Sequence, residues 1–146
     1  MAWSSLLVLG QLASTLPLVG LIWTIQVVHY PLFGAVGEAG FVGYHARHST
    51  RISVVVIPLM LVELVTTIGS VAVGISPWTS LIPVVVVWAT TFLISVPLHG
   101  RLGAGFDPCA HRALVVTNWI RTAAWTAHGA MLLVAIAPAI SAAEGG

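Results

Sequence analysis

The sequence predicts an all-α integral membrane protein, a four-helix bundle with up-down-up-down topology. Hydrophobic residues make up 58% of the 146 residues and charged residues only 6%, and the mean hydropathy is +1.04. A water-soluble globular protein could not cover its surface with this composition. A membrane-spanning helix needs about 20 apolar residues, and the chain has four runs of that kind. We therefore expect a single transmembrane domain over residues 1–146, in contact with the lipid bilayer.

Turn residues and charges separate the four apolar runs. The first run contains Pro17, a candidate kink, and lacks the positively charged start of a cleaved signal peptide, so we expect a retained anchor. Arg51 precedes the second run, Gly74 follows it, and Pro77 marks a turn before the third. The spans are expected at residues 3–28, 52–73, 80–98 and 111–138. Short connections between them predict antiparallel neighbours.

The segment from Tyr30 to Thr50, between spans one and two, mixes aromatic residues with glycines and charges, which is typical of an amphipathic interfacial piece. Loops one and three carry four of the five arginines, whereas the termini and loop two carry none. By the positive-inside rule these two loops face the cytoplasm and both termini lie outside. The scattered arginines and the net charge of +1 give no nucleic-acid footprint.

A polar stripe in the fourth span is the clearest indication of a functional site. Its members are spaced 7, 3, 4 and 3 residues apart, and at about 100° per residue they share one helix face. They are His111, Asn118, Arg121, Trp125 and His128. An arginine inside a membrane span is rare, and it faces a partner or a wet cavity.

Glu63 in the second span is the expected partner of Arg121. At 1.5 Å rise per residue, Glu63 lies roughly 18 Å beyond Arg51, and Arg121 lies roughly 15 Å beyond His111. A lone charge at that depth costs several kcal/mol, so we expect Glu63 and Arg121 to form an ion pair across the bundle. The alternative is a pair that only fixes the register of the helices.

The neighbours of this pair predict a polar pocket with an aromatic wall, because Asn118 and Trp125 lie one turn either side of Arg121. Such a pocket suits an anionic or carbonyl-bearing planar ligand that Arg121 and Asn118 would hold. Glu63 would act as the acid–base group. We therefore name Glu63, Arg121 and Asn118 as the candidate catalytic residues.

Two histidines form a second candidate group nearer the arginine-bearing side. His29 ends span one beside Gln26, and His99 ends span three, each close to a proline. The two imidazoles could approach one another and hold a metal ion or a haem iron. They could also carry protons or lie at the interface without a site. The candidate cofactor-binding residues are His29, His99, Trp125 and Gln26, with His29 and His99 as metal ligands.

A resemblance to a known family rests on three segments: QVVHYPLFGAVGEAGFVGYHARHSTR (26–51), PLHGRL (97–102) and TNWIR (117–121). They look like the small four-span bacterial membrane proteins of the anthrone-oxygenase-like group, a domain of largely unknown function. The resemblance implies a bacterial inner membrane location. Members are associated with oxidation of polycyclic phenolic substrates, which implies an oxidase or oxygenase role. The histidine that ends span one, before an aromatic-rich loop, is also similar to small haem-binding membrane oxidases.

The sequence leaves three functions open. The first is a membrane oxidoreductase that binds a hydrophobic aromatic or quinone-like small molecule, with a metal or haem as candidate cofactor. The second is a small proton-coupled transporter with Glu63 as the exchanging carboxylate, which requires a homo-oligomer because four spans are few for one pathway. The third is a structural subunit of a larger membrane complex, whose polar stripe would pack against another chain and leave no internal cavity.

Overall fold

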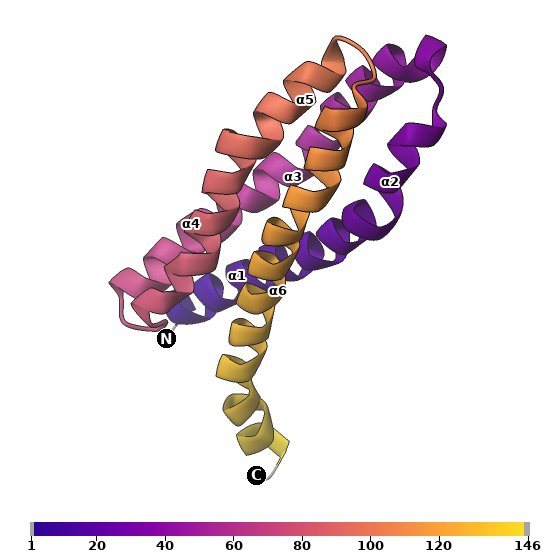
Figure 1. The fold of residues 1–146 in the computed structure, drawn as a ribbon. Coiled ribbons are helices and arrows are strands. Elements are labelled where there is room, and N and C mark those ends of the chain that lie inside the picture. The colour runs from indigo at the N-terminus through magenta and orange to yellow at the C-terminus, as the bar shows by residue number, and fades with distance from the viewer. Residues whose placement is uncertain (1, 145–146) are drawn as a thin grey trace.

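The computed structural model describes residues 2–144 and shows four helical rods joined by short loops (Figure 1). The first rod consists of α1 (Ala2–Thr24), the π-helical turn η1 (Ile25–His29), α2 (Tyr30–Leu32) and the 3-10 turn η2 (Phe33–Ala35). The second rod is α3 (Glu38–Ala72). The third consists of η3 (Trp78–Ser80), α4 (Leu81–Thr90), the π-helical turn η4 (Thr91–Ser95) and α5 (Val96–Gly103), and the fourth is α6 (Pro108–Glu144).

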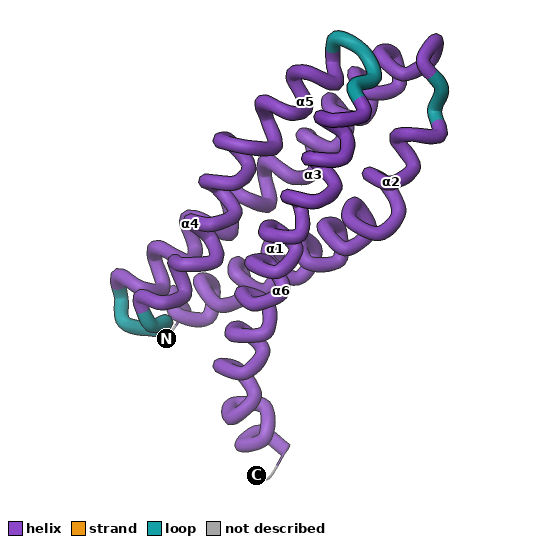
Figure 2. The backbone as a smooth tube through the Cα atoms, in the orientation of Figure 1, coloured by secondary structure: helices purple, strands orange, loops and turns teal. Residues whose placement is uncertain are grey.

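Consecutive rods run in opposite directions. The N-terminus and the loop over residues 73–77 lie together at one end, and the other two loops lie at the opposite end (Figure 1). The last turns of α6 project away from the other rods, so the C-terminal end of this helix stands apart (Figure 1). Helix continues through the described residues with loop only at the three connections (Figure 2). The predicted all-α four-helix bundle is therefore confirmed. We call the end that holds the loops over 36–37 and 104–107 the arginine-bearing end.

The outside of the bundle is suited to lipid. All four rods are long and apolar enough to cross a membrane, and large apolar side chains cover their outer faces. Val54, Leu93 and Val134 are 71%, 76% and 73% exposed. Exposed apolar surface of this extent is not sustained in water. The protein is a multi-pass membrane protein.

Residues 30–50 do not form a separate interfacial segment, which corrects the expectation from the sequence. Residues 30–35 continue the first rod and α3 already begins at Glu38, so only Val36 and Gly37 connect the two rods. Gly37 has a φ of 78°, a conformation that favours glycine and lets a very short loop reverse the chain. The polar residues from Glu38 to Thr50 form the first turns of α3, where Glu38 and Arg47 are exposed and His45 turns inward. His45 is buried at 3% exposure.

Small residues let α1 and α3 approach closely near the N-terminal end. A Cβ added to Gly10 would lie 2.7 Å from Thr66 Cγ2, and one added to Gly69 would lie 2.9 Å from Leu7 Cδ2. Gln11 Nε2 crosses the interface and donates to the carbonyl of Thr66 at 3.1 Å. Close packing of small residues is the main source of helix association in a membrane, because lipid supplies no hydrophobic drive.

The two π-helical turns arise from two prolines. Proline has no backbone N–H and cannot donate the helical hydrogen bond to the carbonyl four residues earlier. Pro31 therefore leaves the carbonyl of Val27 without this bond, and Pro97 leaves the carbonyl of Leu93 without it. Val27 is the middle residue of η1, and Leu93 is the middle residue of η4. A missing helical bond is relieved by a local widening of the helix. Both rods therefore change register where their histidines, His29 and His99, approach the bundle interior.

The contact between α1 and α3 makes the first prediction. Gly10→Leu should lower the melting temperature in detergent by several degrees, because overpacking costs about 1–3 kcal/mol. The Thr66 methyl cannot rotate away, since its hydroxyl donates to the carbonyl of Val62 at 2.6 Å. Gly20→Leu on the same helix is the control, because nothing lies within 4 Å of an added Cβ there. Equal melting temperatures for the two variants would contradict this packing.

Candidate functional site

Arg121 lies on the inward face of α6 and is 6% exposed. Its Nη1 donates to Ser95 Oγ of η4 at 3.1 Å, its guanidinium carbon lies 5.3 Å from the centroid of the Trp125 ring, and its Nε has no hydrogen-bond partner. Among the side chains that the structure describes, the one ion pair joins His128 and Glu63. No carboxylate therefore neutralises Arg121, and a buried guanidinium without a counter-charge costs several kcal/mol.

A cavity of about 530 Å³ lies between α3 and the third rod, with Arg121 among its lining residues. We call it the lateral cavity. Side chains from all four rods line it. They are Ile25, Tyr30, Ser49, Ile52, Ser53, Val56, Ile57, Met60, Leu61, Trp88, Thr91, Phe92, Ser95, Val96, His99 and Arg121.

The lateral cavity runs from the lipid-facing surface to the polar interior. Ile57 and Phe92 are 54% and 57% exposed, whereas Tyr30 and Ser95 are 3% and 4% exposed. The exposed lining residues are apolar and the buried end carries the guanidinium of Arg121. An apolar wall with a few convergent polar groups is the usual character of a small-molecule site. A hydrophobic molecule could enter this site directly from the bilayer.

The lateral cavity also collects buried polar atoms that have no hydrogen-bond partner. Four such atoms belong to lining residues: Ser49 Oγ, Trp88 Nε1, Thr91 Oγ1 and Arg121 Nε. Buried polar groups in folded proteins nearly always have a hydrogen-bond partner. Each group left without one lowers the stability of the fold by about 1–3 kcal/mol. All four atoms can donate a hydrogen bond, and Arg121 Nε and Trp88 Nε1 can only donate. The cavity therefore favours a guest with oxygen acceptors.

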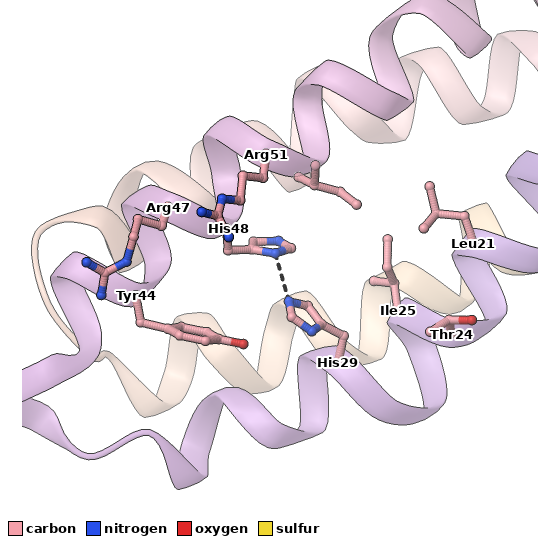
Figure 3. Close-up of a pocket in the computed structure, with 9 residues that line it drawn as sticks. Leu21, Thr24, Ile25, His29, Tyr44, Arg47, His48 and Arg51 are labelled. Carbon is pink, nitrogen blue, oxygen red and sulfur yellow. Dashed lines mark hydrogen bonds between the residues drawn. The ribbon is translucent and has the colours of Figure 1, made fainter.

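A chain of ionisable side chains leads from the lateral cavity to the arginine-bearing end. Tyr30 Oη lies 3.0 Å from His99 Nε2, and His99 Nδ1 lies 2.9 Å from His45 Nε2. His48 stacks on His99 with 6.1 Å between ring centroids. Its Nδ1 lies 2.7 Å from His29 Nε2, the bond drawn in Figure 3. We call His29, His45, His48 and His99 the histidine cluster.

The predicted ion pair between Glu63 and Arg121 is wrong. Glu63 Oε1 accepts from His128 Nδ1 at 2.8 Å and from Thr15 Oγ1 at 3.2 Å, and Oε2 accepts from Trp125 Nε1 at 3.0 Å. Glu63 and His128 are both 0% exposed. Trp125 thus lies between Glu63 and Arg121. Its indole N–H donates to the carboxylate of Glu63, and its ring packs against the guanidinium of Arg121.

The depth estimate failed because it started from the wrong residue. α3 begins at Glu38, so Glu63 lies 25 residues from the start of its helix. Arg121 and His128 lie 13 and 20 residues from the start of α6 at Pro108. At 1.5 Å per residue, His128 is about 10 Å deeper than Arg121 and closer to the level of Glu63. The partner of the carboxylate is therefore the deeper member of the stripe.

Asn118 and Gln26 bind one another instead of facing the lateral cavity. Asn118 Nδ2 donates to Gln26 Oε1 at 2.8 Å, and Gln26 Nε2 donates to the carbonyl of Val115 at 3.1 Å. This bond ties η1 to α6 one turn from Arg121, so both residues hold the site together. Their predicted contact with a ligand, and that of Trp125, stays a prediction.

No hydrogen bond or ring contact joins the predicted metal ligands, His29 and His99, directly. His48 lies between them, and both ring nitrogens of His99 are engaged, by Tyr30 and by His45. Within the described residues, no group of three or more His, Cys, Asp or Glu side chains is arranged to hold a metal ion. The assignment of His29 and His99 as metal ligands stays a prediction, and the histidine cluster consists of two hydrogen-bonded pairs, His29 with His48 and His45 with His99, in contact through the rings of His48 and His99.

The sequence missed two residues that define the site. Tyr30 looks like an interfacial aromatic from its position at the end of a span, yet it is 3% exposed and contacts His99. From the sequence Ser95 is only a hydroxyl one turn before His99, yet it accepts a hydrogen bond from Arg121. The prolines Pro31 and Pro97 lie next to both residues, but they are a weak signal, because Pro17 and Pro58 lie inside regular α-helix without a π-helical turn.

The contacts of Glu63 can be tested with two double-mutant cycles on the free energy of unfolding. The cycle of Glu63→Gln with His128→Asn should give a coupling energy of about 1–3 kcal/mol, as expected for directly bonded residues. The cycle of Glu63→Gln with Arg121→Gln should be additive within about 0.5 kcal/mol. Additivity for Glu63 with His128, together with a coupling energy of about 1–3 kcal/mol for Glu63 with Arg121, would instead support the ion pair that the sequence predicted.

The chain has no match among protein-family models, curated proteins or solved structures. The resemblance to the anthrone-oxygenase-like group therefore stays a prediction from the sequence.

Proposed function

We propose that this protein is a membrane oxidoreductase that binds a hydrophobic aromatic or quinone-like substrate in the lateral cavity. The observation that carries the proposal is the buried guanidinium of Arg121, which has no carboxylate partner and lines a cavity that is open to lipid. An oxygen of the substrate would supply the missing acceptor. The proposal accords with the resemblance to proteins associated with oxidation of phenolic substrates.

The lining of the lateral cavity is suited to a planar ring with oxygens on it. Met60 and Phe92 offer apolar contact for the ring and a hydrocarbon tail. Arg121 Nε and Trp88 Nε1 are donors without partners, which suits two acceptors on one ligand. A guanidinium also stabilises a phenolate more than a phenol, so Arg121 would favour loss of a proton from a quinol.

Tyr30, His99 and His45 form a proton relay for that step. A quinol hydroxyl gives its proton to Tyr30 Oη, Tyr30 passes its own proton to His99 Nε2, and His99 passes the proton on Nδ1 to His45 Nε2. Each quinol that becomes a quinone releases two protons and two electrons. The electrons pass to a separate acceptor, such as a second quinone of higher potential, because no side chain of the relay can store them.

The buried pair of Glu63 and His128 favours a second candidate, the proton-coupled transporter. Arg121 forms no ion pair with Glu63, and Thr67 Oγ1, Ser70 Oγ and His128 Nε2 are buried without partners. In this alternative Glu63 exchanges protons during transport. Glu63→Gln would then abolish proton uptake by reconstituted vesicles and leave quinone binding unchanged. The purely structural subunit is disfavoured, since the polar stripe is buried within the chain itself.

Quinone binding should depend on Arg121. With a decyl-substituted benzoquinone as probe, Arg121→Met should weaken binding at least tenfold, because hydrogen bonds to charged groups contribute about 1.5–3 kcal/mol. The same variant should melt at a higher temperature, since it removes an uncompensated buried charge. Arg112→Met is the control, an exposed arginine on the same helix. Parent-like binding by Arg121→Met would refute the proposed site.

Proton transfer should depend on Tyr30. Tyr30→Phe should bind the quinone probe within about threefold of the parent, yet it should oxidise the corresponding quinol, with ferricyanide as acceptor, at least 100-fold more slowly. The solvent isotope effect on that rate should change as well. Thr117→Val is the control, because the Thr117 hydroxyl donates only within its own helix, to the carbonyl of Ala113. An unchanged rate for Tyr30→Phe would remove the relay from the mechanism.

A further inference from the structure

A second cavity, of about 420 Å³, lies between the end of the first rod and the beginning of α3. Figure 3 shows Tyr44, Arg47, His48 and Arg51 along α3, with His29 facing them from the first rod. The rest of its lining is mainly apolar, with Leu21, Ile25 and Ile52. We call it the arginine cavity. It is distinct from the lateral cavity, although Ile25 and Ile52 contribute to both.

The charge of the arginine cavity is uncompensated. Arg47 and Arg51 are four residues apart and so lie on one face of α3, where like charges repel. No carboxylate lines the cavity, and the only ion pair among the described residues lies elsewhere, at Glu63. His29 and His48 use one ring nitrogen each in their mutual hydrogen bond, which leaves each ring a second nitrogen. Because one ring donates and the other accepts in that bond, the pair of neutral rings keeps one N–H for a guest. Two guanidiniums and this one imidazole N–H together form a site for an anion with several oxygens.

The shape and place of the arginine cavity favour a lipid over a soluble anion. The four arginines outside the bundle interior cluster at one end of the rods, where the membrane surface is expected. From Arg51 toward Leu21 the lining changes from cationic to apolar, which matches the change from phosphate to acyl chain in a phospholipid. Basic pockets between transmembrane helices are established sites for anionic headgroups.

We propose that the arginine cavity binds one anionic phospholipid, with its phosphate between Arg47 and Arg51 and the start of an acyl chain against Leu21 and Ile25. This site is separate from the proposed quinone site and does not depend on it. The lipid would also cover the accessible side of His29 and His48, which form the outer part of the histidine cluster.

Native mass spectrometry and nanodisc titration with dioleoyl phosphatidylglycerol and dioleoyl phosphatidylcholine test this proposal. The parent should retain one phosphatidylglycerol with at least tenfold preference over phosphatidylcholine. Arg47→Gln/Arg51→Gln should lose that preference. The control, Arg101→Gln/Arg112→Gln, removes the same charge from exposed positions at the same end and should stay within twofold of the parent. Equal losses in the two double variants would overturn the site, because they would show only diffuse attraction to the membrane.

Two further measurements separate the lipid from other anions. Thr24→Trp should fill the exposed lining of the cavity and weaken phosphatidylglycerol binding at least fivefold while all arginines remain. Inorganic phosphate at tenfold excess over phosphatidylglycerol should not displace the lipid. Displacement by phosphate, or unchanged lipid binding in Thr24→Trp, would contradict a phospholipid site. The melting temperature of each variant is compared with that of the parent, as the control for an intact fold.

Discussion

The organisation of this bundle depends on one charge that the protein does not neutralise. Arg121 is held by Ser95 and by the face of Trp125, and the carboxylate that could have paired with it is bonded to His128, Thr15 and the same Trp125. Trp125 therefore keeps the guanidinium and the carboxylate apart while contacting both. Because a buried charge without a partner is costly, the fold keeps Arg121 at the expense of stability.

Two prolines shape the site around this charge. Pro31 and Pro97 each remove one helical hydrogen bond, and the resulting π-helical turns rotate the residues that follow them. Tyr30 and His99 then meet across the bundle at 3.0 Å. The same widening places Ser95 within reach of Arg121. The site is thus set by backbone geometry as much as by its polar side chains.

The two cavities share a wall in the histidine cluster. His99 lines the lateral cavity, His29 and His48 line the arginine cavity, and hydrogen bonds and ring stacking connect these side chains between the two. The hydrogen bonds form two separate runs, Tyr30–His99–His45 and His29–His48, which meet only through the ring contact of His48 with His99. A separate polar centre, formed by Glu63 and His128, lies deeper and belongs to neither cavity.

The sequence by itself determined the membrane class, the four helices, their alternating direction and the inward position of Arg121, because composition and helical periodicity are local properties. It did not determine the partner of Glu63, the burial of Tyr30 or the two cavities. Those features depend on where each helix begins and how its turns are wound. The depth of Glu63 was counted from Arg51, 13 residues after the true start of α3, and this error led to the prediction of Arg121 as its partner in place of His128. Only the tertiary structure decides such pairings, because contacts between helices depend on the relative depth and rotation of whole rods, which no single helix encodes.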